Sequence, residues 1–350
     1  MKTISIPGAY DIFIGAGLLS EAGERIRAVS DAQRACIVAD SNVRGLYADR
    51  VRRSLETAGF EASVYEFPAG ERHKTLETVA GMLNCFAARR LTRADLVVAL
   101  GGGVCGDLAG FAAAVYLRGV DFVQIPTTLL AQIDSSVGGK TGCDLPAGKN
   151  LAGAFHQPRL VLIDPDTLST LPDAYLRDGM GEAVKYGCIR SRSLFERLEA
   201  EPPFSSLEDL IYDCVRIKAD IVARDPHEQG ERMLLNFGHT LGHALERYEN
   251  FTGISHGAAV GVGMVLVTRA AERAGLCAPG CAGRIAALLQ KYDLPSGTDA
   301  PLEVLCEHAL ADKKRRADSI HLVLLREIGE SFVHTVKSAE LERFLREGAL

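Results

Sequence analysis

Residues 94–110 place the strongest constraint on the fold, because they run from an apolar segment directly into glycines and then into a helical segment. The apolar run ADLVVAL (94–100) precedes GGGVCGDLAG (101–110), whose glycines satisfy the pattern G-x-G-x-x-G. Between a strand and a helix, this pattern lets backbone N–H groups and a helix N-terminus approach a pyrophosphate closely. The alternative is a tight turn with close helix packing, which would explain Gly110 but not three consecutive glycines.

Short apolar runs alternate with helical segments through the first half of the chain, at 35–40, 61–67, 94–100, 121–125 and 159–164. The alternation predicts a doubly wound parallel sheet, and the glycine turn follows a middle strand, so a standard Rossmann strand order is not implied. From residue 172 the periodicity is helical nearly to the end, with one strand expected at 320–325. We therefore predict an α/β Rossmann-like nucleotide-binding domain at 1–171 and an all-α domain at 172–350.

Polar residues follow several of the expected strands. Asp40 ends one strand, where an acid can hold a ribose hydroxyl or simply cap the next helix. Lys140 and Lys149 lie in glycine-rich loops that suit a phosphate or a carboxylate. The GKT triplet at 139–141 lacks the first glycine of a Walker A loop, so a nucleoside triphosphate site is rejected.

Histidines gather in one short part of the second half. If residues 232–246 form one helix, Arg232, Asn236, His239 and His243 lie on one face of it, between apolar flanks. With His256 just beyond, this polar stripe indicates a metal or anion site. A pair of hydrogen-bonded core histidines is the alternative reading of any one of them.

Two lysines in the helical half sit in contrasting patterns. Lys218 falls within the apolar stripe of its helix, so it must either extend to solvent or meet an anion, and we favour the anion. Lys185 lies three residues after Glu182 on one helical face, and taken alone this pair reads as a surface ion pair.

Composition excludes several classes of function. A net charge of −6 and a pI near 5.9 argue against a nucleic-acid surface, since the one basic run, at 313–316, is short. The N-terminus has no apolar signal segment and the apolar run 258–267 is too short to cross a bilayer, so we expect a cytoplasmic protein that does not bind membranes. The nine cysteines suit reduced thiols, and Cys277 and Cys281 lack partners for a shared metal.

Seven motifs in order resemble the 3-dehydroquinate synthase family: GGGVCGDLAG (101–110), PTTL (126–129), DSSVGGKT (134–141), GKN (148–150), GEAVK (181–185), LNFGHTLGH (235–243) and DKK (312–314). The resemblance runs nearly end to end. It implies conversion of the seven-carbon sugar-acid phosphate DAHP to 3-dehydroquinate and phosphate, with an NAD that is reduced and reoxidised within one turnover. It also implies a divalent metal, zinc or cobalt, and a homodimer.

The same resemblance implies roles for individual residues. The metal ligands would be Glu182, His239 and His256. The substrate would contact Arg118, Lys140, Lys149, Asn150, Lys185, Lys218, Arg232, Asn236, His243 and either Lys313 or Lys314. The NAD would contact Asp40, Asn42, Glu71, Lys74, Gly102, Gly103, Asp107, Thr127, Thr128, Leu130, Asp134, Lys140, Lys149, Thr167, Thr170 and Leu171. Tyr175 departs from the family pattern, because an acid is expected there near the adenosine of NAD.

Three other functions compete with this one. A metal-dependent NAD polyol dehydrogenase would leave the lysines of the glycine-rich loops without a purpose. Other sugar phosphate cyclases usually alter the segment DSSVGGK, which is intact here. A catalytically inactive NAD-binding regulator predicts lost metal or phosphate ligands, and none is lost.

Overall fold

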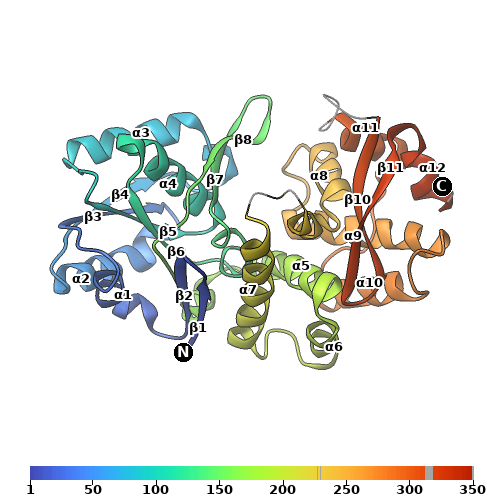
Figure 1. The fold of residues 1–350 in the computed structure, drawn as a ribbon, viewed down its shortest axis with the longest axis horizontal. Coiled ribbons are helices and arrows are strands. Elements are labelled where there is room, and N and C mark those ends of the chain that lie inside the picture. Colours follow the sequence, from blue (N-terminus) through green and yellow to red (C-terminus); the bar gives the residue numbers. More distant parts are fainter. Residues whose placement is uncertain (227, 229, 312–317, 349–350) are drawn as a thin grey trace. The chain divides into compact units, whose positions relative to one another are not determined.

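The computed structural model describes residues 1–226, 228, 230–311 and 318–348. The chain forms two compact units, Met1–Pro172 and Asp173–Leu350 (Figure 1). Among the described residues, no helix is both long enough and apolar enough to cross a membrane.

The first unit is built on a seven-stranded sheet with the order β1-β2-β9-β6-β5-β3-β4. Its strands are β1 (Lys2–Ile6), β2 (Tyr10–Ile14), β3 (Arg34–Asp40), β4 (Glu61–Phe67), β5 (Leu96–Gly101), β6 (Asp121–Pro126) and β9 (Leu160–Ile163). All neighbouring pairs are parallel except β1 and β2, which form an antiparallel hairpin at the edge. The predicted parallel sheet is confirmed, with β5 in its interior between β6 and β3, whereas the edge hairpin was not predicted.

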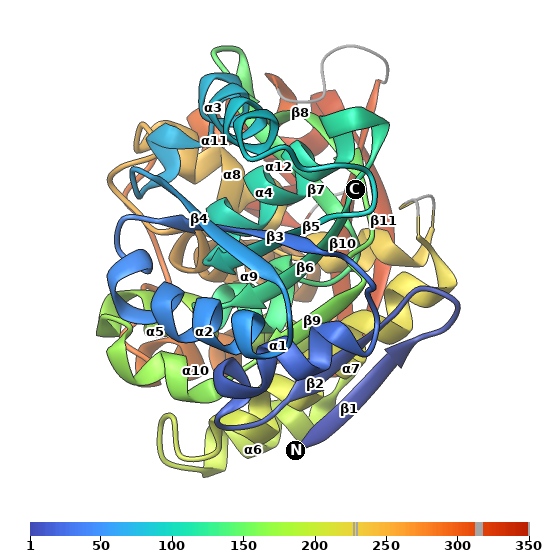
Figure 2. The ribbon, with the colours of Figure 1, turned by 90° about the vertical axis from the view of Figure 1, so that its left-hand side faces the viewer.

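Helices cover both faces of this sheet (Figure 2). They are α1 (Leu18–Arg27) and α2 (Asp49–Thr57) on one face, and α3 (Leu76–Ala88) and α4 (Gly103–Val115) on the other. Strand β3 shows why both faces are covered: Ile37 packs in the core under α1 and α2, and Val38 in the core under α3 and α4. Successive side chains of a strand point to opposite faces, so an uninterrupted apolar run requires two buried faces.

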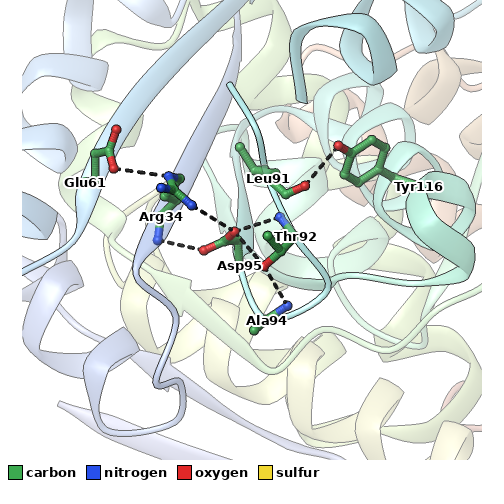
Figure 3. A network of polar contacts seen from close by, with 7 residues as sticks. All are labelled: Arg34, Glu61, Leu91, Thr92, Ala94, Asp95 and Tyr116. Atoms are coloured by element: carbon green, nitrogen blue, oxygen red, sulfur yellow. Dashed lines mark hydrogen bonds and ion pairs between the residues drawn. The ribbon is translucent and has the colours of Figure 1, made fainter. Parts of the chain in front are cut away.

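A polar network around Asp95 closes the amino-terminal edge of the sheet (Figure 3). The buried Asp95 carboxylate accepts hydrogen bonds from the backbone N–H of Arg34 at 2.9 Å and from Thr92 N at 2.7 Å and Oγ1 at 2.9 Å. The side chain of Arg34 also pairs with Glu61, at 3.1 Å. These contacts fix the starts of β3, β4 and β5, and leave the opposite, carboxyl-terminal edge for other roles.

A separate hairpin follows β6 in the chain. Strands β7 (Lys140–Leu145) and β8 (Gly148–Phe155) pair antiparallel, with β7 against α4. The sequence predicted glycine-rich loops here, and this prediction was wrong. Gly142 and Gly153 lie where the two backbones approach so closely that a Cβ on either would clash with the opposite strand.

The second unit is mainly helical. Its helices are α5 (Asp173–Arg190), α6 (Arg192–Ala200), α7 (Leu207–Arg224), α8 (His239–Tyr248), α9 (His256–Arg273), α10 (Cys281–Lys291), α11 (Leu302–Ala311) and α12 (Leu341–Glu347). Two strands, β10 (Ser319–Glu327) and β11 (Glu330–Lys337), form an antiparallel pair. The expected strand at 320–325 is confirmed as part of β10, but the unit is not strictly all-α, since β11 was missed.

Helix α9 is the centre of this unit and is buried along most of its length, as predicted. Glycines allow its neighbours to touch it backbone to backbone. A Cβ on Gly181 of α5 would clash with the backbone of Gly257, and one on Gly257 would clash with Asp178. A Cβ on Gly263 would likewise clash with Gly238, just before α8. Helices α5, α8 and α9 therefore meet at unusually short separation.

Candidate active site

Three potential metal ligands converge in the second unit where α5, α8 and α9 meet. Glu182 is fully buried, and its Oε1 lies 3.3 Å from Nε2 of His239 and 3.5 Å from Nε2 of His256. The ligand atoms of the three residues all lie within 4.8 Å of one another. Two imidazole nitrogens and a carboxylate oxygen form a donor set typical of catalytic zinc, which keeps a further coordination position open.

The other ring nitrogens of these histidines have oxygen partners. Nδ1 of His239 lies 3.1 Å from the carbonyl oxygen of Phe237. Nδ1 of His256 lies 3.5 Å from Oε2 of Glu246, a buried acid of α8. An oxygen that binds the outer nitrogen of a metal-bound histidine fixes its tautomer and orientation. The sequence reading did not single out Glu246, although its position seven residues after His239 on a helix was a usable signal.

A metal cation would be a suitable partner for the buried carboxylate of Glu182. Neither of its oxygens accepts a hydrogen bond of ordinary geometry from the described residues, although Oε2 pairs with Nζ of Lys185. Burial opposes ionisation of Glu182, but Lys185 and His239 outweigh it and hold its pKa well below the usual range. Because Lys185 is itself buried, the sequence reading of a surface ion pair was wrong.

A second group of donors shares His256. His243, Glu246 and His256 also have ligand atoms within 4.8 Å of one another. The ring centroid of His243 lies 5.4 Å from that of His239 and 5.9 Å from that of His256. We favour the group with Glu182, because the Glu246 contact uses Nδ1 of His256 and leaves Nε2 directed at Glu182.

The predicted single helix through the histidines is interrupted, and this prediction was wrong. A 3-10 turn, Glu231–Asn236, ends before α8, and Gly238 adopts a left-handed φ of +79°. The break arises because Gly238 packs against Val260 and Met264 of α9, where a side chain has no room. Arg232 and Asn236 therefore belong to a different segment from His239 and His243.

The remaining predicted substrate contacts of this unit have distinct environments. Arg232 is buried, and its guanidinium donates to the carbonyl oxygen of Pro226 at 2.6 Å, while Nδ2 of Asn236 donates to Glu228 at 2.8 Å. Lys218 is buried on α7, and His243 is exposed on α8. Lys313 and Lys314 lie outside the described residues.

In the first unit, the glycine turn lies at the carboxyl-terminal edge of the sheet between β5 and α4. Gly102 and Gly103 begin the helix, with Thr128 and Ser135 so close that added Cβ atoms would lie 3.0 and 3.1 Å from their side chains. Deeper in α4, Gly110 packs on Thr141 and Phe122. The close-packing reading therefore holds for Gly110, while the pyrophosphate reading of the first glycines stays a prediction.

Lys74 is the centre of a charged cluster beside this turn. Its buried Nζ lies 2.7 Å from Oδ2 of Asp107 and donates to Oδ1 of Asn150 at 2.6 Å. Burial lowers the pKa of Lys74, but the carboxylates of Asp107 and Glu71 outweigh this effect and raise it. Lys149 reaches to 4.0 Å from Glu71. The predicted NAD contacts Glu71, Lys74, Asp107 and Lys149 and the predicted substrate contacts Lys149 and Asn150 therefore come together here.

Several of the other predicted NAD contacts follow strands that end at the same edge. Asp40 accepts backbone hydrogen bonds from Asn42 at 2.9 Å and Val43 at 3.2 Å, so it does cap the following turn. Burial raises the pKa of Asp40. The others follow β6 and β9: Thr127, Thr128, Leu130, Asp134, Lys140, Thr167, Thr170 and Leu171. Of these, Thr167 and Thr170 both bind the hydroxyl of Tyr47, a residue that the sequence reading missed.

Two predicted positions stand apart. Arg118 is exposed at the end of the turn that follows α4, at the opposite end of that helix from the glycines. Tyr175 is 57% exposed near the start of α5.

The glycine turn after a parallel strand and the His-His-Glu cluster place this chain in the class of two-unit proteins that includes the sugar phosphate cyclases. Two family descriptions match consecutive parts of this chain. The family 3-dehydroquinate synthase N-terminal matches residues 64–178, and the family 3-dehydroquinate synthase C-terminal matches residues 179–315. The chain belongs to the 3-dehydroquinate synthase family.

Curated relatives extend this match to nearly the whole chain. The 3-dehydroquinate synthase of Clostridium acetobutylicum is 42% identical over 99% of this chain and 99% of its own. That of Streptococcus sanguinis is 46% identical over 97% of each chain.

Solved structures confirm the fold class. The 2-epi-5-epi-valiolone synthase from Streptomyces hygroscopicus subsp. jinggangensis, with NAD⁺ and Zn²⁺ bound, has a TM-score of 0.86 and 30% identity, covering 99% of this chain and 97% of its own. A 2-deoxy-scyllo-inosose synthase complexed with carbaglucose-6-phosphate, NAD⁺ and Co²⁺ also reaches 0.86, at 26% identity over 99% and 100% of the chains. Glycerol dehydrogenase from Schizosaccharomyces pombe, at 14% identity and a TM-score of 0.65 over 96% and 88%, shares the fold alone.

Proposed function

We propose that this protein is a 3-dehydroquinate synthase, which converts DAHP to 3-dehydroquinate and phosphate in the shikimate pathway of aromatic amino acid biosynthesis. The observation that carries the choice of reaction is the 42% to 46% identity to 3-dehydroquinate synthases over almost the full chain. The intact segment DSSVGGK (134–140) favours it over a cyclase of another sugar phosphate.

The proposed cofactors are NAD and a divalent metal, zinc or cobalt. Glu182, His239 and His256 would hold the metal, and their buried carboxylate and paired imidazoles support this assignment. Residues at the carboxyl-terminal edge of the first unit's sheet would hold NAD, with its pyrophosphate at the N-terminus of α4. When bound, the metal lowers the pKa of a substrate hydroxyl and NAD takes up and later returns a hydride.

The chain's own residues would bind and orient a substrate with two anionic groups. Lys185, Lys218 and Arg232 are buried cations in the helical unit, and burial strengthens their attraction for a phosphate or carboxylate. Asn236 and His243 would contact substrate hydroxyls or phosphate. The family resemblance also assigns substrate contacts to Lys140, Lys149, Asn150 and Arg118. Oxidation of the hydroxyl to a ketone acidifies the neighbouring C–H bond, so phosphate can be eliminated. Reduction, ring opening and an intramolecular aldol closure then give the product.

Two further properties are proposed from the family alone. We expect the protein to act in the cytoplasm and to form a homodimer. Sedimentation of the purified protein would measure the second, and a monomer at the concentration of the activity assay would contradict it.

The direct test incubates metal-loaded protein with NAD and DAHP, and follows the release of phosphate together with 3-dehydroquinate. No phosphate above background would refute the proposal. Accumulation of free NADH with glycerol would instead favour a polyol dehydrogenase, and phosphate release from a hexose 6-phosphate but not from DAHP would favour another cyclase. The variant His256→Ala should lose turnover while still binding NAD, and turnover that persists in a chelator would count against a metal.

A further inference from the structure

Two cysteines lie at the junction between α9 and α10. Cys277 lies in the loop and Cys281 is the first residue of α10, and both side chains are buried. The loop is held in shape by backbone bonds, in which Cys277 N donates to Ala271 at 3.2 Å and Ala278 N donates to Arg326 at 2.7 Å. The two thiols are therefore placed by the fold and not by a flexible segment.

A carboxylate completes this group. The ligand atoms of Glu272, Cys277 and Cys281 all lie within 4.8 Å of one another. Glu272 is also fixed, because its Oε1 accepts a hydrogen bond from Ala282 N at 2.8 Å. The sequence reading that the two cysteines lack a partner was wrong, since Glu272 comes from the last turn of α9.

Two thiols and one carboxylate supply three of the donors that zinc uses, and water can take the fourth position of a tetrahedral site. This group is distinct from the first cluster, because Glu272 lies sixteen residues beyond His256 on α9, about 24 Å along the helix axis.

The chemistry of these donors selects the class of ion. Burial and the neighbouring thiol of Cys281 raise the pKa of Cys277. A divalent ion supplies the charge that allows two thiols to ionise, with release of two protons and no change of oxidation state. Thiolate ligands favour zinc, cadmium or cobalt over magnesium or calcium.

We propose that Glu272, Cys277 and Cys281 form a second binding site for a thiophilic divalent metal. It joins the end of α9 to the start of α10. The site takes part in neither substrate binding nor the reaction, so it stands or falls independently of the proposed function.

Cobalt provides a test that separates the two sites. Metal-free protein, kept reduced with a phosphine, is titrated with Co²⁺ while metal content and the near-ultraviolet spectrum are measured. Only thiolate ligands give a thiolate-to-cobalt charge-transfer band, and the His-His-Glu cluster contains no sulfur. We expect two cobalt ions per wild-type chain with the band, one without the band in Cys277→Ser and Cys281→Ser, and one with the band in His256→Ala.

Two further variants control for the loss of a thiol and for misfolding. Cys306→Ser removes a buried thiol on α11 and should keep both ions and the band. Because His256→Ala leaves the cysteines intact, a poorly folded cysteine variant cannot hide the result. Absence of the band in both wild type and His256→Ala overturns the proposal. So does a Cys277–Cys281 disulfide that persists in the reduced protein, detected by mass spectrometry.

Discussion

The Nδ1 atom of His256 lies 3.5 Å from Oε2 of Glu246, while Nε2 of the same ring lies 3.5 Å from Oε1 of Glu182. The imidazole is thus held between two buried carboxylates. Each ring nitrogen has its own acid, and the two acids come from different helices. Glu246 is therefore a positioning residue. It orients His256, a proposed metal ligand, and is not itself a ligand.

Glu246→Gln should therefore weaken metal binding while the protein stays folded. The neutral amide is a poorer acceptor for the Nδ1 proton, and loss of such outer partners typically costs roughly 10- to 100-fold in metal affinity. Competition with a chromogenic chelator measures the affinity. Glu307→Gln, an exposed acid on α11, is the matched control and should leave it unchanged. Equal affinities for the wild type and Glu246→Gln would show that Glu246 does not orient His256.

Substitution of His239 and substitution of His243 should have different effects on metal content. His239→Ala removes a ligand and should leave the His-His-Glu cluster without its ion. His243→Ala should retain that ion but lose turnover with DAHP, because His243 is assigned to the substrate. Metal analysis of dialysed protein, with both variants in a Cys277→Ser background, measures the first cluster alone. Retention in His239→Ala and loss in His243→Ala would instead assign the metal to His243, Glu246 and His256.

The buried pair of Glu182 and Lys185 should make Glu182→Gln strongly destabilising in metal-free protein. Removal of one partner of a buried ion pair costs about 3–5 kcal/mol in unfolding free energy, because the buried charge of Lys185 loses the carboxylate that offsets its desolvation. The double variant Glu182→Gln/Lys185→Met should recover most of that loss. Urea unfolding in the presence of a chelator measures the unfolding free energy of the wild type, the single variant and the double variant. As control, Glu199→Gln breaks a partly exposed pair with Arg284 and should cost less than about 1 kcal/mol. Single and double variants of equal stability would contradict this account.

Cys85 should be the most reactive thiol in the folded protein. It is the one cysteine of the nine that is not buried. A hydrogen bond from Cys36 lowers its pKa and Arg89 adds to this, so that despite partial burial the pKa falls to about 6. A lowered pKa means that the thiolate is present above pH 6 and is lost as the pH falls through that value. Alkylation by iodoacetamide, followed peptide by peptide, should have its midpoint near pH 6.

Removal of the hydrogen-bond donor supplies the control. In Cys36→Ala the midpoint for Cys85 should move up toward the ordinary thiol pKa of about 8.5. The buried Cys306 should stay unmodified until the protein unfolds. An unchanged midpoint in Cys36→Ala would exclude that thiol as the cause.

The sequence predicts most strands and helices of this protein because their apolar periodicity is local. Strand β4 has the predicted bounds, and the apolar residues that flank the polar stripe are buried as expected, at Leu235, Phe237, Leu241, Ala244 and Leu245. The break at Gly238 could not be read from the same periodicity, because it depends on Val260 and Met264 of another helix. The β7–β8 hairpin was missed for a related reason, since its glycines are required by the opposite strand and look like loop residues in isolation.

The residues of the candidate site likewise fall into those that the sequence predicts and those that it does not. His239 and His256 stand out in the sequence as residues of a known type and spacing, and the family resemblance adds Glu182. Tyr47 carries no such signal, and Glu246 has only its spacing of seven residues from His239, because the contacts of both arise only when separate segments meet. Glu272 was missed beside Cys277 and Cys281 because the turn that brings it to them is a product of folding.

Each of the three proposed ligands stands next to a glycine at a close helix contact: Gly181 precedes Glu182, Gly238 precedes His239 and Gly257 follows His256. The positions of the ligands are consequently set by helix packing and are already established before an ion arrives. Binding then has little chain to order, so an ion can leave and another can enter without refolding. The choice between zinc and cobalt would therefore be decided by the supply of each ion around the protein and by their intrinsic affinities, rather than by any adjustment of the fold.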